Sequence, residues 1–335
     1  MRDVAERVGV SAMTVSRVMN GNAGVDEEIR GRVLAVVDAL GYRTHRAARS
    51  LKVGDDLRMG LLYANPSSAY LSELLLGSLH EARRSYVQLV VQTCSGDVGI
   101  EQAVDRLVAA RVDGVVLTPP ISESEEVLER LHKLSMPVVS IASARAPHWA
   151  LSVHVDEYLA SYQMTQHLLG RGHRRIGFIT GDPLHSATDL RLRGYLSALA
   201  DGGHSPAAEL IVPGQFTYRS GLDAAEELLD LDERPTAIFA SNDDMAAACV
   251  AIAHQRGLHV PKDLSVCGFD DTALATTIWP ELTTIRQPIS DMSAAAVKLL
   301  AKVIREGSFN RLRSEQRHLK LGFEMKFRGS DGDAG

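Results

Sequence analysis

Residues 58–66 read Arg58-Met-Gly-Leu-Leu-Tyr-Ala-Asn-Pro66, and residues 175–183 read Arg175-Ile-Gly-Phe-Ile-Thr-Gly-Asp-Pro183. The two stretches are offset by 117 residues, and the same offset separates Gly77 from Gly194. Each stretch is a short apolar run that ends in turn-forming residues, which is typical of a buried strand followed by a loop. Any two strand–helix units share some pattern, but glycines and a proline that all keep one offset favour an internal duplication.

The chain beyond residue 58 alternates strand patterns with helical patterns, which predicts an α/β fold with mainly parallel sheets. Strands are expected at 59–63, 87–92, 114–118, 138–142, 176–180, 237–240, 264–268, 283–286 and 318–327. Helices are expected at 72–84, 101–111, 158–169, 189–201, 219–230, 244–257 and 290–305. Ligands of open parallel sheets bind beyond the carboxyl ends of the strands, so residues 64–70 and 181–188 should form two sides of one cleft.

The first 43 residues have a different pattern, with short helices expected at 3–8, 12–19 and about 26–40. A tight turn, Gly9-Val-Ser11, separates the first two, and Ser11 is expected to cap the second helix. This arrangement predicts a helix-turn-helix unit.

Charge is distributed unevenly along the chain, although the net charge is −6. Residues 1–52 carry nine basic and six acidic residues, and the remainder carries 27 and 36. From Gly41 to Lys52 there are four basic residues and no acidic ones. A basic arm on an acidic body indicates contact with a polyanion, and a plain basic linker is the alternative.

The second helix offers the side chains that reading a DNA major groove requires. An arginine can bond guanine in bidentate fashion, a methyl group can contact thymine, and hydroxyls can reach phosphates. The candidates are Ser11, Ala12, Met13, Thr14, Ser16 and Arg17. An ordinary solvated amphipathic helix is the alternative interpretation.

Polar and aromatic residues follow several expected strands, as in proteins that grip sugar hydroxyls. These residues are Tyr63, Asn65, His185, Arg191, Phe216, Asn242, Asp243, Asp270, Asp271 and Gln287. Taken singly, each has a simpler interpretation: Asn242 could begin a helix, and Asp270 could be a turn residue.

Several classes of protein are disfavoured. No apolar run reaches the ~18 residues of a membrane span, and Met1-Arg2-Asp3-Val4-Ala5 has no apolar signal core, so secretion by a signal peptide is not expected. Three scattered cysteines are expected to be reduced thiols of a cytoplasmic protein. The histidines form no cluster with cysteine, so neither a metal nor another cofactor is expected. A glycosidase needs two facing carboxylates, whereas Asp270 and Asp271 are sequence neighbours, so no catalytic role is expected.

The chain resembles the LacI/GalR family of bacterial transcriptional repressors over essentially its whole length. The motifs that carry the resemblance are Asp3-Val-Ala, Gly9-Val-Ser, Thr14-Val-Ser-Arg-Val, Asn20-Gly, Gly41-Tyr, Arg46-Ala-Ala-Arg-Ser-Leu, Val112-Asp-Gly, Gly172-His-Arg-Arg-Ile, Ser241-Asn-Asp, Gly268-Phe-Asp-Asp and Pro280-Glu-Leu-Thr-Thr-Ile-Arg-Gln-Pro288.

The resemblance implies operator DNA as one partner and a small effector, a sugar or glycoside, as the other. It places base reading at Ala12, Met13 and Arg17, assigns Asn20 to the same unit, and makes Leu51 a minor-groove wedge with Ala48, Arg49 and Lys52 beside it. The resemblance places the effector at Tyr63, Asn65, Tyr70, His185, Arg191, Phe216, Asn242, Asp270 and Gln287. Residues 70–80 correspond to the family's dimer-contact helix. The polar tail after Phe327 contains no heptads, so a homodimer on a palindromic operator is expected rather than a tetramer.

The implied domains are a helix-turn-helix domain at 1–43, a hinge helix and linker at 44–57, and an effector-binding body at 58–335. The body should resemble a periplasmic binding protein, with one subdomain at about 58–157 and 287–316 and the other at about 158–286 and 317–330. Three positions depart from the family pattern: Thr44-His45, Met13 and Ala142-Ser143. The alternatives are a co-repressor-dependent regulator that binds a non-sugar metabolite, and a sugar-binding transport protein.

Overall fold

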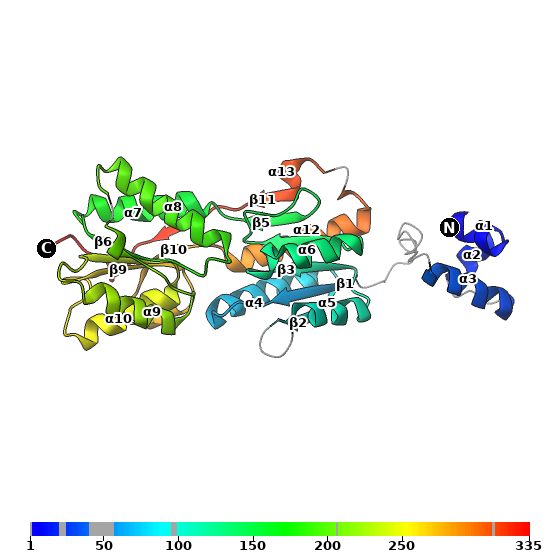
Figure 1. Cartoon of the computed structure of the whole chain (residues 1–335), viewed down its shortest axis with the longest axis horizontal. Coiled ribbons are helices and arrows are strands. Elements are labelled where there is room, and N and C mark those ends of the chain that lie inside the picture. The colour runs from blue at the N-terminus through cyan, green and yellow to red at the C-terminus, as the bar shows by residue number, and fades with distance from the viewer. Residues whose placement is uncertain (1, 20–24, 40–56, 95–98, 206, 310–311) are drawn as a thin grey trace. The chain divides into compact units, whose positions relative to one another are not determined.

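The computed structural model describes residues 2–19, 25–39, 57–94, 99–205, 207–309 and 312–335, which form two compact units (Figure 1). The expected hinge, including Ala48, Arg49, Leu51 and Lys52, and also Asn20 lie outside the described residues.

The first unit is a small three-helix domain, as the sequence predicts. Its helices are α1 (Arg2–Val8), α2 (Ala12–Met19) and α3 (Glu27–Ala39). Its core consists of valines and one alanine, with Val4, Val15 and Val33 fully buried. Arg32 donates a 2.8 Å hydrogen bond to the carbonyl of Val8 and so satisfies the C-terminal end of α1.

The second unit contains two six-stranded sheets. The first sheet has the order β11-β5-β4-β3-β1-β2, and all its strands are parallel. Its strands are β1 (Leu57–Tyr63), β2 (Val87–Thr93), β3 (Gly114–Leu117), β4 (Val138–Ile141), β5 (Leu151–His154) and β11 (His318–Lys320). Its helices are α4 (Ser68–Arg84), α5 (Ile100–Ala109), α6 (Glu125–Lys133), α12 (Ile289–Glu306) and α13 (Ser314–Arg317).

The second sheet has the order β12-β10-β9-β8-β6-β7 and is parallel except for β12. Its strands are β6 (Ile176–Ile179), β7 (Ile211–Val212), β8 (Ala237–Ala240), β9 (Ser265–Asp270), β10 (Thr283–Arg286) and β12 (Glu324–Lys326). Its helices are α7 (Glu157–Gly170), α8 (Ser186–Asp201), α9 (Tyr218–Leu229), α10 (Asp243–Gln255) and α11 (Leu274–Thr277).

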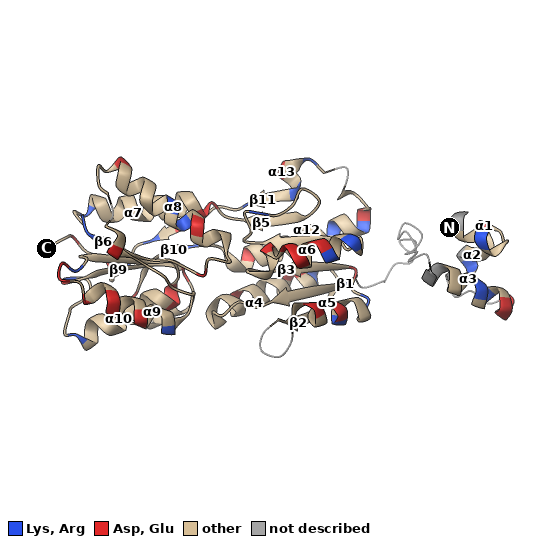
Figure 2. Cartoon of the chain, in the orientation of Figure 1, with Lys and Arg blue, Asp and Glu red and all other residues tan. Residues whose placement is uncertain are grey.

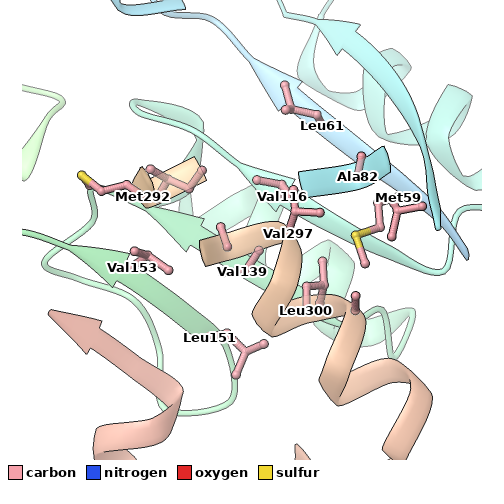
Figure 3. Packing of buried hydrophobic residues seen from close by; sticks show 14 of the residues in the cluster. Met59, Leu61, Ala82, Val116, Val139, Leu151, Val153, Met292, Val297 and Leu300 are labelled. Atoms are coloured by element: carbon pink, nitrogen blue, oxygen red, sulfur yellow. The ribbon is translucent and has the colours of Figure 1, made fainter. Parts of the chain in front are cut away.

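Helices cover both faces of each sheet, because successive side chains of a strand point to opposite faces. In β1, Met59 and Leu61 pack with α4 and α12, whereas Leu62 packs with α5 and α6. Figure 3 shows the first of these clusters, in which Val297 and Leu300 of α12 lie against the strands. Charged residues lie mainly on the helices and loops, and the strands are mostly uncharged (Figure 2).

The glycines of the repeat occupy equivalent positions. A Cβ on Gly77 in α4 would lie 2.1 Å from the carbonyl oxygen of Ser290 at the start of α12. A Cβ on Gly194 in α8 would lie 2.3 Å from the carbonyl oxygen of Tyr158 in α7. In both halves, the glycine therefore allows the backbone of a neighbouring helix to approach closely.

The structure also contains helices and strands that the sequence analysis did not predict, namely β5, β7, α6, α11 and α13. The stretch 318–327, expected as one strand, is two: β11 belongs to the first sheet and β12 to the second. The chain thus passes from one subdomain to the other after Lys320, so β11 lies in the first subdomain although its residues were expected in the second. The segment bridges the edges of two different sheets and cannot stay one strand.

Candidate functional site

The helix-turn-helix unit presents its second helix as the sequence predicts. Ser11 accepts a hydrogen bond from the backbone N–H of Thr14 at 3.0 Å, which confirms it as the cap of α2. Val15 and Val18 face the core, while Ala12, Met13 and Arg17 are exposed and Thr14 is half-buried. The side chain of Ser16 is not part of the described structure. One face of α2 is therefore free to contact another molecule.

A pocket in the second unit gathers residues from both subdomains. We call it the inner pocket, and its cavity volume is about 30 Å³, room for one or two water molecules. Its lining consists of Asn65, Ser67, Tyr70, Pro119, Ala142, Glu157, His185, Ala187, Arg191, Phe216, Asn242, Asp270 and Gln287.

Eight of the nine expected effector residues line the inner pocket, and Tyr63 does not. Tyr63 ends β1 and packs against the hydrophobic core of the first subdomain. The loops 64–70 and 181–188 both contribute lining residues, as the repeat predicts. Among the added residues, Glu157 carries a charge; its signal was missed because it follows β5, a strand absent from the prediction.

Arg191 and Glu157 form a buried ion pair in the inner pocket. The Nε of Arg191 lies 2.8 Å from Oε2 of Glu157, and both side chains are almost fully buried. The guanidinium also donates to the carbonyl of Ser241 and stacks 3.5 Å from the ring centre of Phe269. Arg191 is one of the expected effector residues, but three partners already hold its guanidinium in place.

Asp270 and Gln287 are hydrogen-bonded to each other, with the amide nitrogen of Gln287 donating to Oδ1 of Asp270. Both are almost fully buried. Burial raises the pKa of Asp270 well above its usual range, although the charge of Arg191 acts in the opposite direction. Asp270 is therefore more readily protonated than an exposed carboxyl and is partly committed to Gln287.

Asn242 has the simpler of its two expected roles. Its Oδ1 accepts from the backbone N–H of Met245 at 3.0 Å and caps α10, and its Nδ2 donates to the carbonyl of Phe216 at 3.0 Å. The side chain thus begins a helix and fixes the Phe216 loop, rather than offering free donors to the pocket. A Cβ on Gly181 would overlap the Phe216 ring at 1.9 Å, so only glycine fits beneath that ring.

Asp243 follows Asn242 in the sequence and is fully buried. It joins the start of α10 to the segments that carry Thr272 and Thr284. It accepts hydrogen bonds from the N–H of Thr272 at 2.7 Å and from the hydroxyl of Thr284 at 2.6 Å. Burial raises its pKa to about 7. A Cβ on Gly268 would lie 2.5 Å from Oδ1 of Asp243, so the glycine of the Gly268-Phe-Asp-Asp motif makes room for this carboxyl.

Three buried polar atoms of the inner pocket have no hydrogen-bond partner: the hydroxyl of Tyr70, Nε2 of His185 and Oε1 of Gln287. Each residue is at most 6% exposed. Burial lowers the pKa of His185, which favours its neutral imidazole, and burial raises that of Tyr70, which keeps its hydroxyl protonated. Unsatisfied buried groups are costly, so these atoms mark a place where a polar ligand would be stabilising.

Two sets of hydrogen bonds join the subdomains beside the inner pocket. Ser67 at the start of α4 donates to Asp244 of α10 at 2.5 Å. Glu123 accepts from the N–H of Ser186 at 2.7 Å and from its hydroxyl, and Ser186 Oγ accepts from the N–H of Ala144. Separation of the two subdomains would break these hydrogen bonds.

Three further features of the described residues concern membrane-spanning helices, metal ligands and thiols. In the part of the chain that the structure describes, no helix is long and apolar enough to cross a membrane, and no three His, Cys, Asp or Glu residues form a metal cluster. The three cysteines are free thiols; Cys249 and Cys267 are buried, and Cys94 is half-buried.

Comparison with known proteins agrees with both units. Residues 1–45 match the bacterial regulatory proteins of the lacI family, and residues 165–330 match the periplasmic binding protein-like domain. The catabolite control protein A of Priestia megaterium is 36% identical over 304 residues, which cover 90% of this chain and 91% of that protein. The ribose operon repressor of Haemophilus influenzae is 32% identical over 316 residues, with coverages of 92% and 93%.

Solved structures agree over nearly the full length. A complex of the transcriptional regulator CelR with cellobiose superimposes with a TM-score of 0.75 at 29% identity, covering 98% of each chain. The lac repressor dimer bound to operator and the anti-inducer ONPF gives 0.71 at 25% identity, again covering 98% of each.

Regulators of this family are cytoplasmic DNA-binding proteins that respond to a small-molecule effector and have no enzymatic activity. This chain has the helix-turn-helix unit and the two-sheet body, and it is 36% and 32% identical to the two relatives named above over nine-tenths of its length. The chain therefore belongs to the LacI family of bacterial transcriptional regulators.

Proposed function

We propose that the effector of this regulator is a neutral sugar or glycoside bound at the inner pocket, which must widen from its present volume of about 30 Å³ to hold it. The observation that carries the proposal is the set of three unpartnered buried atoms on Tyr70, His185 and Gln287. Oε1 of Gln287 is an acceptor, and the hydroxyl of Tyr70 can donate or accept. Nε2 of the neutral His185 imidazole donates or accepts according to its tautomer. Adjacent hydroxyls of a sugar both donate and accept, so they can satisfy all three.

The charge of the inner pocket supports a neutral ligand. Arg191 is the one cation among the lining residues, and it is already paired with Glu157 while Asp270 lies close by. An anionic effector would gain little from a cation already neutralised. The Phe216 ring adds an apolar surface for the face of a sugar.

Several similar proteins favour a carbohydrate by their names, and one favours another ligand class. The CelR structure contains cellobiose, and several relatives are ribose operon repressors. Another relative, from Photobacterium profundum, is the repressor PurR, which is 30% identical over 312 residues. A purine base is therefore the competing ligand class, and its stacking would need the single Phe216 ring.

We further propose the division of the chain that its motifs imply: operator recognition by residues 1–43, a hinge at 44–57 that carries Leu51, and an effector-binding body at 58–335. On α4, Leu76 and Leu79 are 61% and 54% exposed, which supports a homodimer that contacts its partner through this helix. A two-fold dimer binds a palindromic operator. Effector binding should release it, because moving the subdomains displaces the paired hinges.

Calorimetry with neutral sugars, sugar phosphates and purine bases tests the effector class. We expect binding of a neutral sugar, loss of operator binding in its presence, and no response in Asp270→Ala, which should retain operator affinity and melting temperature. Binding of a purine base alone, or unchanged sugar affinity in Asp270→Ala, would contradict the proposal. A parallel loss of melting temperature, operator binding and sugar binding would assign Asp270 a structural role.

A further inference from the structure

An exposed methionine lies on the helix that is expected to read DNA. Met13 of α2 is 69% exposed and does not pack into the valine core of the helix-turn-helix unit. Small reagents in solution can therefore reach this side chain in the free protein. An oxidant that reaches a methionine thioether converts it to a sulfoxide, which is polar, and sulfoxide reductases reverse the change.

The other methionines that the structure describes are shielded. Met325 of β12 is half-buried, and five more are at most 4% exposed within the two subdomains. Those five are Met59, Met136, Met164, Met245 and Met292. Among the methionine side chains in the described part of the chain, Met13 is thus the most open to an oxidant.

The cysteines of this chain are weak competitors for an oxidant. The thiolate is the reactive form of cysteine, and burial disfavours it. Burial raises the pKa of Cys249 to about 12 and also raises that of Cys267. Cys94 is half-buried, and burial raises its pKa to about 11, so its thiol is protonated at neutral pH. Among the described sulfur atoms, the thioether of Met13 is therefore the one that a peroxide can reach in a reactive form.

Met13 lies beside the arginine that is expected to read a base. Residues 13 and 17 are one helical turn apart, so their side chains are neighbours on the surface of α2. Both are exposed, whereas Val15 and Val18 face the core. A thioether offers a base no strong hydrogen bond, so Met13 can select a base only by apolar contact, as with the methyl group of thymine.

We propose that Met13 is a reversible oxidation site through which a peroxide weakens operator binding. This inference rests on the proposed operator recognition by residues 1–43. In the forward step the sulfur attacks one oxygen of hydrogen peroxide, an S–O bond forms and the O–O bond breaks. The proton of the transferred oxygen passes to the departing hydroxide, which leaves as water, so the sulfur is oxidised by two electrons and the peroxide is reduced. Two thiols reverse the step, giving the thioether, a disulfide and water.

The sulfoxide should disturb base reading in two ways. It replaces an apolar contact with a polar group, which loses the preference for thymine. Its oxygen is also a hydrogen-bond acceptor one turn from Arg17, whose guanidinium can only donate. A bond between the two would draw the guanidinium away from guanine. Contacts with phosphates are left intact, so specific binding should fall while binding to random DNA persists.

The test uses the full chain and a DNA duplex that the untreated protein selects from a randomised pool. After treatment with hydrogen peroxide, we expect affinity for the selected duplex to fall at least about tenfold, as for the loss of one base contact. Affinity for a random duplex should not change. Methionine sulfoxide reductase with dithiothreitol should restore the original affinity. Peptide mass spectrometry should show the added oxygen on Met13, and should show it forming more slowly when the selected duplex is bound.

Met13→Leu keeps an apolar side chain that peroxide does not oxidise, and Met325→Leu is its matched control. Each variant is assayed on a duplex that it selects itself, before and after peroxide. Peroxide should leave the affinity of Met13→Leu unchanged and should lower that of Met325→Leu as it does for the wild type. The same mass spectra follow Met1 and Met19, whose side chains are not part of the described structure.

The possible failures are distinguishable. A peroxide-induced loss that persists in Met13→Leu, or that remains after the reductase has restored Met13, places the sensitive group elsewhere and overturns the oxidation site. Equal losses on selected and random duplexes, or equally fast oxidation of Met13 in the DNA complex, also overturn it. An unchanged affinity after peroxide overturns it while operator recognition stands. An untreated protein that selects no duplex overturns operator recognition and this inference together.

Discussion

Arg191 and Glu157 come from two packed helices, α8 and α7, and meet as an ion pair whose side chains are 5% and 6% exposed. Removing one partner of a buried pair leaves the other charge uncompensated, so Glu157→Gln should lower the free energy of unfolding by about 3 kcal/mol. Urea unfolding measures this loss. Asp223→Asn breaks a surface pair, Arg219–Asp223, and should cost less than about 1 kcal/mol. Equal losses of unfolding free energy would show that the buried pair stabilises the protein no more than the surface pair does.

Gly194, the one glycine of α8, should not tolerate replacement by alanine. Gly194→Ala places a methyl group against the backbone of α7 and should destabilise the protein by about 1–3 kcal/mol through overpacking. Gly170→Ala is the control, since a Cβ there meets nothing within 4 Å and α7 gains a better helix former. Thermal melts of both variants measure the effect. An unchanged melting temperature in Gly194→Ala would mean that α7 and α8 can move apart without loss of stability.

Asp331 should make stability depend on pH in the acid range. Burial tends to raise its pKa, but hydrogen bonds from His167 and Thr283 and the charge of Arg171 lower it below 3.8. The unfolded chain therefore binds a proton more readily, so the stabilisation is full above the ordinary pKa and is lost as pH falls through the folded value.

Asp331→Asn should accordingly lower the unfolding free energy at pH 7, and its difference from the wild type should shrink below about pH 4. Asp333→Asn is the control, because that carboxylate contacts the same Arg171 but its side chain is 85% exposed. Unfolding titrations between pH 3 and 7 measure both. A difference that stayed constant over this range would assign the effect to packing rather than to charge.

Arg17 should read a base. It is exposed on α2, and Arg17→Ala should cost about 1–3 kcal/mol of operator affinity, concentrated at one base position of each half-site. Lys52→Ala should instead weaken specific and random DNA alike and flatten the salt dependence. Fluorescence anisotropy with single-base operator variants separates the two effects, and equal losses on all sequences for Arg17→Ala would exclude base reading.

The sequence predicted the strong local patterns well. The helix-turn-helix, its Ser11 cap and most of the long helices and strands appear where periodicity and turn residues place them. The repeat predicted that the loops after β1 and β6 would share a pocket. The sequence analysis did not predict β5 and β7, because polar Ser152 and His154 interrupt the apolar run of β5 and because β7 has only two residues.

The sequence by itself determined the layered α/β architecture and the three-helix unit before it, because these follow from apolar periodicity and turn chemistry. The rule that ligands bind at strand ends, together with the family resemblance, pointed to eight residues of one pocket. Tertiary structure decided which polar groups are free. Only packing brings Glu157 to Arg191, commits Asn242 to a helix cap and leaves atoms of Tyr70, His185 and Gln287 without partners. Such pairings join residues distant in the chain, and no local pattern records which partner a buried group finds.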